Sequence, residues 1–387
     1  MQITKRGAAA MLAAVVLVAA CGNGAATPAT SAAPSGAASV APSEAASPSE
    51  AAGWTPQYVD GKLQPLPDGF PNQPITLIVV DEAGSDDGIY ARAAQAAADK
   101  VSPVAINVDD RPDFGSTFGT FEALNNVAAQ PGGKDGYTVV VATQTGSVFD
   151  LLTTPVAKEL NVSLDSINWV ANTERVPWVI ISPSDRPWGT SFEDFLDACK
   201  AAPGTLKYLS RGPGASVNTA FNQYMMLAGC EVNEVIGGSS QEIAISIGAG
   251  VGDIAISIVG VTLPVVEDNK AVVLACSGNI DPCPGDWDPA ISPAAKVVGL
   301  ELDPWGSTRG YAVPKDVPDL HRAWLTELFI KLTEDPDYKA NRAQLPGHAF
   351  VNLDHDGAME IARGLIDGGY DVLKEMGGLD PSVTSKP

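Results

Sequence analysis

The segment ITLIVVDEAGSDDGIYARAAQAAADKV, residues 75–101, contains the pattern that decides the fold. Ile75–Val80 is an unbroken apolar run, which predicts a buried strand. Asp81–Gly88 is a polar turn that contains glycine, and Ile89–Val101 has the spacing of a helix. A strand, a short turn and a helix in this order predict one unit of an α/β protein.

The same alternation returns along the chain. Further strands are predicted at Tyr137–Ala142, Trp178–Ser182, Leu206–Leu209 and Asp253–Ile258. Capping boxes at Thr190–Glu193 and Ser239–Glu242 predict helices to about Ala202 and over Ile243–Gly248. Other helices are expected from Ser216 to Leu227, near Asp319–Leu332 and near Gly357–Glu375. The chain is therefore expected to be α/β, with mainly parallel sheets and flanking helices.

The N-terminus, MQITKRGAAAMLAAVVLVAAC, has the features of an export signal. Lys5 and Arg6 precede a short apolar run, which is too short for a comfortable membrane span. Val18–Cys21 resembles a bacterial lipobox, which implies that residues 1–20 are a lipoprotein signal peptide and that Cys21 is lipidated. An ordinary cleaved signal with an incidental cysteine is the alternative. We expect the mature chain to be extracytoplasmic, in the periplasm or at the cell surface.

Residues 21–53 consist almost entirely of Ala, Ser, Pro, Gly and Thr. Such a stretch has too little bulky apolar surface to offset the entropy of ordering it. We expect a disordered tether between the membrane and a folded part that begins at Trp54.

The charge balance limits the partners of the protein. Asp and Glu number 46 against 24 Lys and Arg, which gives a formal net charge of −22. Phosphate contacts need clustered basic residues, so nucleic-acid binding is not expected. Net charge does not exclude a small anionic ligand, because surface charges are screened within about 8 Å at physiological salt.

Four cysteines follow Cys21, namely Cys199, Cys230, Cys276 and Cys283. An even number in an exported chain favours disulfides, and three pairings are possible. We favour Cys199–Cys230 and Cys276–Cys283, because the second pair closes a short loop through two prolines. Metal binding is the alternative, but no CxxC spacing supports it, and no cofactor or metal is expected.

Three glycine- and serine-rich turns each lead from a strand to a helix, at Asp81–Gly88, Ser210–Ser216 and Gly237–Glu242. Unpaired N–H groups and the helix dipole make such turns anion-binding sites in principle. If two or three converge, four or five charge-assisted hydrogen bonds of about 1.5–3 kcal/mol each are enough for micromolar binding of a small dicarboxylate. If the turns converge on a cleft, they can hold carboxylates there without a buried lysine or arginine.

Five blocks of sequence resemble the substrate-binding receptors of tripartite tricarboxylate transporters, the Bug family. They are Phe70–Val79 with Ala83-Gly84 and Ala91-Arg92, Asp135–Thr138, Pro203–Tyr208 with Ser210, Gly238-Ser239 with Gly250 and Asp253, and Trp305-Gly306 with Pro314. Their order and spacing carry the resemblance, which covers most of residues 68–375.

The resemblance implies a two-lobed periplasmic-binding-protein fold of type II that closes on a small carboxylate and performs no catalysis. It also implies that backbone donors of Ala83–Gly88 and Ser210–Ser216 hold the ligand. The division expected is residues 54–177 with 296–387 as lobe 1, and residues 178–295 as lobe 2. Arg211 departs from the family pattern, in which that residue is usually small.

The candidate ligand-binding residues lie in and beside these turns. They are Ala83, Gly84, Ser85, Asp86, Asp87, Gly88, Thr143, Gln144, Thr145, Ser147, Arg211, Gly212, Gly214, Ser216, Asn218, Gly238, Ser239 and Trp305. Arg211 could bind a ligand carboxylate or pair with Asp86 or Asp87. Those two acids could hold a ligand amine or cap the helix. Ser216 could cap its helix, Trp305 could be buried, and Asp354–Asp356 reads better as a helix cap than as a metal cluster.

These observations predict a lipid-anchored solute-binding receptor that delivers a small organic acid to membrane transporter subunits and works as a monomer. An exported hydrolase on the same fold and a sensory receptor are the alternatives. The sequence contains no G-x-S-x-G, H-E-x-x-H, Walker A or G-x-G-x-x-G motif. The ligand itself is not specified by the sequence.

Overall fold

The computed structural model describes residues 53–80, 85–113, 119–212, 215–279, 283, 291–344 and 347–387. The predicted signal peptide, Cys21 and the tether as far as residue 52 lie outside these residues. Both sheets belong to the compact unit 46–387. Among the described helices, none has the length and apolar character needed to span a bilayer.

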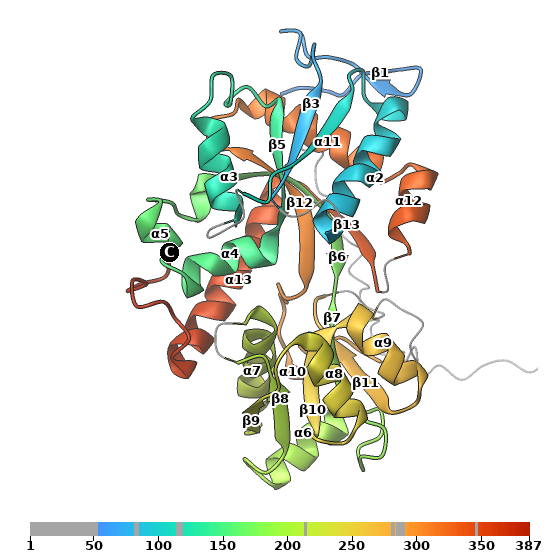
Figure 1. Cartoon of the computed structure of the whole chain (residues 1–387), viewed down its shortest axis with the longest axis vertical. Helices are drawn as coiled ribbons and strands as arrows, with labels where there is room; N and C mark the ends of the chain where they lie inside the picture. The colour runs from blue at the N-terminus through green and yellow to red at the C-terminus, as the bar shows by residue number, and fades with distance from the viewer. Residues whose placement is uncertain are drawn as a thin grey trace, which may run out of the picture. The chain divides into compact units, whose positions relative to one another are not determined.

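The larger sheet has six strands (Figure 1). Its order is β13 (Ala349–Leu353), β6 (Ile167–Val176), β12 (Ser307–Pro314), β5 (Thr138–Thr143), β3 (Ile75–Val79) and β4 (Ile106–Asp110). The β3–β4 and β3–β5 pairs are parallel, and the other three pairs are antiparallel.

The smaller sheet has five strands and is built from the middle of the chain. Its order is β11 (Ala271–Cys276), β7 (Trp178–Pro183), β10 (Ile254–Ile258), β8 (Lys207–Ser210) and β9 (Asn233–Ile236). Two pairs are parallel, and two are antiparallel. A separate small hairpin joins β1 (Tyr58–Val59) to β2 (Lys62–Leu63).

The expected α/β class is confirmed, but the sheets are mixed and not mainly parallel. Of the strands predicted from the sequence, β3, β5, β8 and β10 take part in parallel pairs, whereas β7 makes only antiparallel pairs. No strand was predicted at β4, β6, β9, β11 or β13. The antiparallel pairs involve β6, β12 and β13 in the six-stranded sheet and β7 in the five-stranded sheet. Antiparallel neighbours need no crossover helix, so the alternation of strands and helices that predicts parallel pairs does not reveal them.

Helices cover both faces of each sheet. They are α2 (Asp86–Val101), α3 (Gly119–Ala128), α4 (Gln144–Thr153), α5 (Val156–Glu159), α6 (Phe192–Ala201), α7 (Ser216–Ala228), α8 (Ser240–Gly248), α9 (Val259–Glu267), α10 (Ala294–Val298), α11 (Asp319–Leu332), α12 (Pro336–Arg342) and α13 (His355–Met376), with a 3₁₀ turn at Leu164–Ser166. Successive strand residues point to opposite faces, so each strand serves two cores. In β5, Val139 and Val141 pack with α2 and α11, whereas Val140 and Ala142 pack with α3 and α4.

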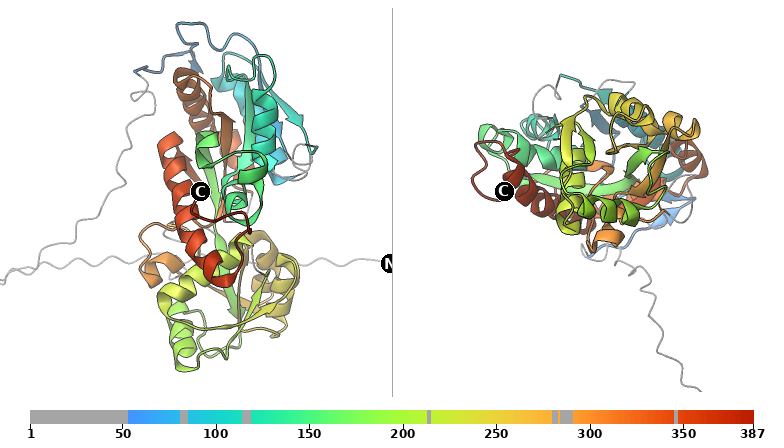
Figure 2. Two further views of the ribbon diagram at one scale, coloured as in Figure 1. Left: turned by 90° about the vertical axis from the view of Figure 1, so that its left-hand side faces the viewer. Right: turned by 90° about the horizontal axis from the view of Figure 1, so that it is seen from below.

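One of these cores continues from the six-stranded to the five-stranded sheet. It includes Trp169 of β6 and Ile180 of β7. The long helix α13, red in Figures 1 and 2, contacts both α4 and α7. The opposite face of β7, which carries Val179 and Ile181, packs with α8 and α9.

The capping predictions succeed at one helix and fail by one residue at another. Ser239 caps α8, and its hydroxyl and the Glu242 side chain form the predicted box. At α6, however, the cap is Ser191, whose Oγ lies 3.0 Å from the Asp194 backbone N, so Thr190 is not the cap. Both residues are good caps by type, and only the backbone path decides between them.

Both favoured disulfides are present. Cys199 bonds Cys230, and Cys276 bonds Cys283, with Cα–Cα distances of 5.6 and 5.9 Å. All four thiols are therefore consumed, which removes the alternative of a cysteine metal site.

Candidate functional site

The two sheets meet where one residue, Pro177, separates β6 from β7. In the six-stranded sheet, Val176 pairs with Ser307, and Thr143 pairs with Arg309. Therefore β5 ends beside the end of β6 and the start of β12. Because β3 runs parallel to β5, it ends there too. We call this edge the six-stranded junction edge.

The five-stranded sheet has a matching edge. Ile258, at the end of β10, pairs with Trp178 at the start of β7. Since β8 is parallel to β10 and β9 is parallel to β8, all three strands end at this edge. We call it the five-stranded junction edge. The three turns singled out in the sequence follow strands that end at these two edges, where ligands bind in open α/β sheets.

Ser85 caps α2 at the six-stranded junction edge. Its Oγ accepts a hydrogen bond from the backbone N–H of Gly88, with 3.0 Å between the heavy atoms. Ser85 thus performs the capping that the sequence analysis offered to the two acids after it. Ala83 and Gly84 lie outside the described residues, and only the backbone of Asp86 is described.

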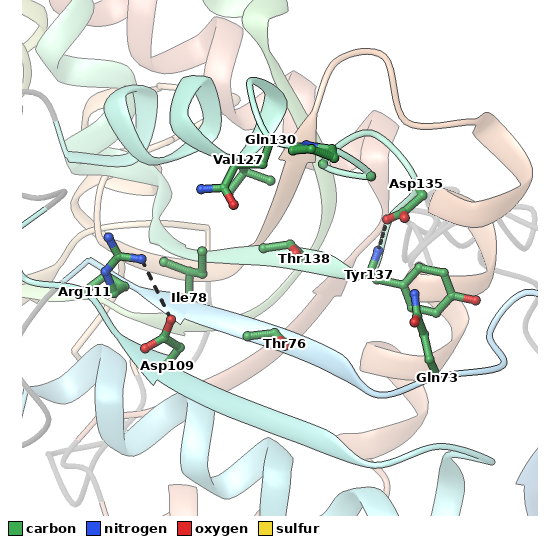
Figure 3. Close-up of a pocket in the computed structure, with 13 residues that line it drawn as sticks. Gln73, Thr76, Ile78, Asp109, Arg111, Val127, Gln130, Asp135, Tyr137 and Thr138 are labelled. Atoms are coloured by element: carbon green, nitrogen blue, oxygen red, sulfur yellow. Dashed lines mark hydrogen bonds and ion pairs between the residues drawn. The ribbon is translucent and has the colours of Figure 1, made fainter.

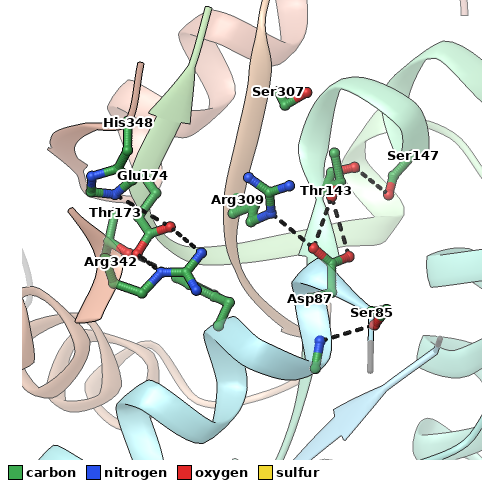
Figure 4. Close-up of polar contacts among 12 residues, drawn as sticks. Ser85, Asp87, Thr143, Ser147, Thr173, Glu174, Ser307, Arg309, Arg342 and His348 are labelled. Carbon is green, nitrogen blue, oxygen red and sulfur yellow. Dashed lines mark hydrogen bonds and ion pairs between the residues drawn. The ribbon is translucent and has the colours of Figure 1, made fainter. Parts of the chain in front are cut away.

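Asp87 forms a buried ion pair with Arg309 (Figure 4). Arg309 Nε lies 3.1 Å from Asp87 Oδ1, and the Thr143 hydroxyl lies 3.1 and 3.2 Å from the two carboxylate oxygens. The Asp87 and Arg309 side chains are 12% and 9% exposed. The structure thus pairs Asp87 with Arg309, whereas the sequence analysis offered Arg211. Because Asp87 is neutralised in place, it offers a ligand amine little net charge.

The remaining candidates after β5 are buried and bind other parts of the protein. Gln144 is fully buried, and Thr145 and Ser147 are nearly so. Their side chains donate to backbone carbonyls: Gln144 to Ala358, Thr145 to Gly306 and Ser147 to Thr143. These contacts fasten α4 to α13 and to the start of β12. Gln144 and Thr145 therefore use side-chain hydrogen-bonding groups within the protein, and their ligand role stays a prediction.

The second turn begins at the end of β8. The Ser210 hydroxyl accepts from the Gly212 N–H at 2.8 Å and donates to Glu234 Oε1 at 2.6 Å. Gly212 has φ +91°, a conformation that favours glycine. Arg211 is exposed at this edge. Gly214 lies outside the described residues.

The helix after this turn starts without a side-chain cap. The cap position is Ala215, so Ser216 is the first helical residue and not the cap that the sequence suggested. Asn218 is fully buried, and its Nδ2 lies 3.1 Å from Glu234 Oε1. Asn218 therefore fixes α7 to β9.

The third turn leads into α8. Gly238 has φ +94°, and Ser239 N lies 2.8 Å from Glu242 Oε2. The next residue, Ser240, is 9% exposed, and its hydroxyl has no hydrogen-bond partner in the structure. The sequence analysis passed over Ser240 because the capping box accounted for its neighbours, and no sequence signal distinguishes a satisfied hydroxyl from an unsatisfied one.

Trp305 is fully buried, as its structural reading anticipated. It stacks against Trp178, and its Nε1 donates to Gln223 Oε1 at 2.6 Å. Beside it, the carboxylate of Asp303 accepts from Trp305 N, Gly278 N and the Tyr224 hydroxyl. Burial raises the pKa of Asp303 even so. These contacts join the segments on either side of the junction.

A second buried ion pair joins β6 of the six-stranded sheet to α12 (Figure 4). Glu174 and Arg342 have fully buried side chains, with Nε–Oε1 and Nη2–Oε2 distances of 2.8 and 2.9 Å. The hydroxyl of Tyr338 also donates to Glu174, and His348 Nε2 lies 3.4 Å from it. Burial pushes the pKa of Glu174 upward, but the neighbouring His348 and Arg342 outweigh this and hold it below its usual value. The sequence analysis missed this pair, whose members are 168 residues apart.

The Asp354–Asp356 segment is a helix cap. Asp354 Oδ1 accepts from the Gly357 N–H at 3.0 Å, and His355 Nδ1 lies 2.9 Å from the Trp169 carbonyl. Within the described ranges, no three His, Cys, Asp or Glu side chains are grouped to hold a metal ion.

A cavity of about 300 Å³ lies against β3, β4 and β5 (Figure 3). Thr76, Thr138 and Arg111 are among its lining residues. Arg111 Nη2 lies 2.9 Å from Asp113, and Nη1 lies 4.0 Å from Asp109. Its charge is balanced by these acids, so the junction edges are the better candidate site.

Comparison with known proteins adds a family to this geometry. The family model "Tripartite tricarboxylate transporter family receptor" matches residues 90–283. A protein of the UPF0065 group from Cupriavidus necator is 25% identical over 283 residues, which cover 72% of this chain and 80% of that protein.

Solved structures show the same fold. A solute-binding protein of the TctC type from Polaromonas superposes with a TM-score of 0.66 at 20% identity, covering 79% of this chain and 99% of that one. MatC from Rhodopseudomonas palustris with bound malate gives 0.51 at 18% identity, covering 79% and 100%. An R. palustris protein with adipate gives 0.53 at 16% identity, covering 80% and 99%.

Proposed function

Because the chain belongs to the tripartite tricarboxylate transporter receptor family, we propose that it captures a small carboxylic acid between its two junction edges. Proteins of this family are solute-binding receptors and not enzymes, so the hydrolase alternative is withdrawn. The observation that carries the proposal is the strand register, because α2, α7 and α8 all begin after strands that end at the two junction edges.

The proposed lobes are residues 54–177 with 296–387, and residues 178–295. The hinge is Pro177 together with the segment that returns to β12. A ligand that contacts both lobes favours the closed state, because in that state it makes contacts that the open state lacks. The hydrogen bonds to Asp303 lie at this hinge and would fix the path of the segment that returns to β12.

The ligand is proposed to be an acid without an amino group. Helix N-termini at both edges offer N–H groups and a favourable dipole to a carboxylate. The acidic side chain described at the start of α2, that of Asp87, is already paired with Arg309. Two similar structures contain malate and adipate, which supports this class of ligand.

The proposed setting is the outer face of a bacterial membrane. Lipidation of Cys21 would anchor the chain, and residues 21–53 would let the receptor move between solute and transporter subunits. Family members are periplasmic, which supports export. We propose that the receptor acts as a monomer.

Mass spectrometry of protein purified without stripping its ligand tests the proposal. We expect a small carboxylic acid in near-equimolar amount, and rebinding of that acid to stripped protein by calorimetry. A ligand that carries an amine, or a stripped protein that binds no carboxylic acid, would contradict it.

A further inference from the structure

Ser240 carries a buried hydroxyl that the protein itself leaves unsatisfied. Its residue is 9% exposed, and its Oγ has no hydrogen-bond partner. Burying a hydroxyl without a partner costs about 1–3 kcal/mol, so such groups are rare unless something else binds them.

The position of Ser240 places this hydroxyl at the five-stranded junction edge. Ser240 is the first residue of α8, a helix of nine residues. Ser239 accepts from the N–H groups of Glu242 and Ile243, so those of Ser240 and Gln241 are the ones without a partner inside the helix. Ser257, next to the end of β10, has its Oγ 3.4 Å from the Ser240 carbonyl O. The start of α8 is therefore held over the end of β10.

Two exposed isoleucines lie at the same edge. Ile236 ends β9 and is 68% exposed, and Ile258 ends β10 and is 37% exposed. Ile258 directly follows Ser257. A Cβ added to Gly212 would lie 3.7 Å from Ile236 Cδ1, so this side chain extends over the second turn. Large exposed apolar side chains beside polar donors are typical of ligand sites.

We infer that the start of α8 is a ligand subsite, in which the Ser240 hydroxyl and the N–H groups of Ser240 and Gln241 bind a carboxylate of the solute while Ile236 and Ile258 cover its carbon skeleton. This inference rests on the proposed function. It restricts the proposed ligands to carboxylic acids with an aliphatic or aromatic carbon skeleton. Such a ligand satisfies the buried hydroxyl and removes the two isoleucines from water together.

The test uses the full chain, stripped of ligand, with succinate, adipate and benzoate as calorimetric probes. For the tightest of the three, we expect Ser240→Ala to raise Kd about tenfold, the value of one good hydrogen bond to a charged group. Its Tm without ligand should not fall, because the hydroxyl makes no bond in the free protein.

Ser191→Ala is the matched control. Ser191 caps α6, which follows the opposite end of β7, and its hydroxyl does have a partner. We expect this variant to lower Tm and to leave Kd unchanged. If Ser240→Ala changes Kd by less than twofold, the hydroxyl is not part of a subsite and the inference is wrong.

Ile258→Ser tests the apolar part of the proposed subsite, which Ile236 and Ile258 form. Adipate and benzoate should lose more affinity than succinate, which has the shorter carbon chain. An equal loss for all three acids would overturn this half of the inference. If the unmodified protein binds neither these probes nor the acid found by mass spectrometry, the proposed function fails and the subsite fails with it. If the unmodified protein and Ser240→Ala bind an acid equally well, only the subsite is wrong.

Discussion

The six-stranded and five-stranded sheets are stabilised by different chemistry. The first holds two buried ion pairs, Glu174–Arg342 and Asp87–Arg309. The second is joined to its surroundings by both disulfides. Its ion pair, Arg186–Asp253, leaves each side chain 23% exposed.

The difference follows from how much core each sheet has. One member of each ion pair lies on a strand that is buried along nearly its whole length, Glu174 on β6 and Arg309 on β12, where only a matched charge is tolerated. The outer strand β9, by contrast, is exposed along its length. A covalent link at Cys230, just before β9, stabilises a region where burial contributes less.

The comparison also concerns ligand binding. At the six-stranded junction edge the described charges of Asp87 and Arg309 are engaged with each other. At the five-stranded junction edge, Arg211 is exposed and Ser240 is unsatisfied. We therefore expect substitutions at the first edge to act mainly on stability and those at the second edge mainly on affinity.

Glu174→Gln should have the largest effect on stability. It removes the carboxylate that pairs with the fully buried Arg342, and we expect a loss of about 3–5 kcal/mol in the free energy of unfolding. Because the pKa of Glu174 lies below its usual value in the folded protein, the stabilisation exists at neutral pH and is lost as pH falls. Urea denaturation measures the change.

Glu360→Gln on the exposed side of α13 is the control, with an expected change below about 0.5 kcal/mol. If the two variants were equally stable, the six-stranded sheet would not depend on its ion pair and the comparison would break.

Removing the Cys199–Cys230 disulfide by a double alanine substitution should cost about 2–4 kcal/mol. The bond closes 31 residues, against 7 for Cys276–Cys283, so the chain-entropy model makes the loss of the second bond about 1.3 kcal/mol smaller. Thermal unfolding of the two double variants shows which disulfide contributes more to stability. The reverse order would show that native-state packing, and not loop length, sets the difference.

Asp150 should show the opposite pH dependence to Glu174. Burial raises its pKa to about 6, so the folded protein binds this proton more tightly than the unfolded chain does. The resulting stabilisation is present below the unfolded pKa and is lost as pH rises through about 6. Asp150→Asn should therefore be more stable than the parent at neutral pH, by at most about 3 kcal/mol, with the difference vanishing near pH 4. Urea denaturation of both proteins at pH 7 and pH 4 measures this difference in the free energy of unfolding. A difference that does not change with pH would contradict the prediction.

Arg211→Ala should have the smallest energetic effect, about 1.4 kcal/mol, seen as a tenfold rise in Kd for the bound acid with unchanged Tm. The exposed guanidinium at the five-stranded junction edge would then act on the ligand and not on the fold. Arg363→Ala, on α13 outside both edges, is the matched arginine deletion. An unchanged Kd for Arg211→Ala would return this residue to a surface role.

Local patterns in the sequence determined much of the architecture. The apolar run at Ile75–Val80 gives β3, the box at Ser239 gives the start of α8, and an even cysteine count with a short proline-containing loop gives both disulfides. Each of these depends on residues close together in the chain, or on only a few possible pairings, so local propensity and geometry are sufficient.

Tertiary structure alone decided which side chains meet. Asp87 pairs with Arg309 and not Arg211, Trp305 is buried, and Gln144 faces α13. Glu174 and Arg342 come together through the register of β6 and the placement of α12. Such contacts depend on strand order and on how sheets and helices stack over hundreds of residues. Residue type and spacing place a charged side chain on an element, but only the packed fold supplies its partner.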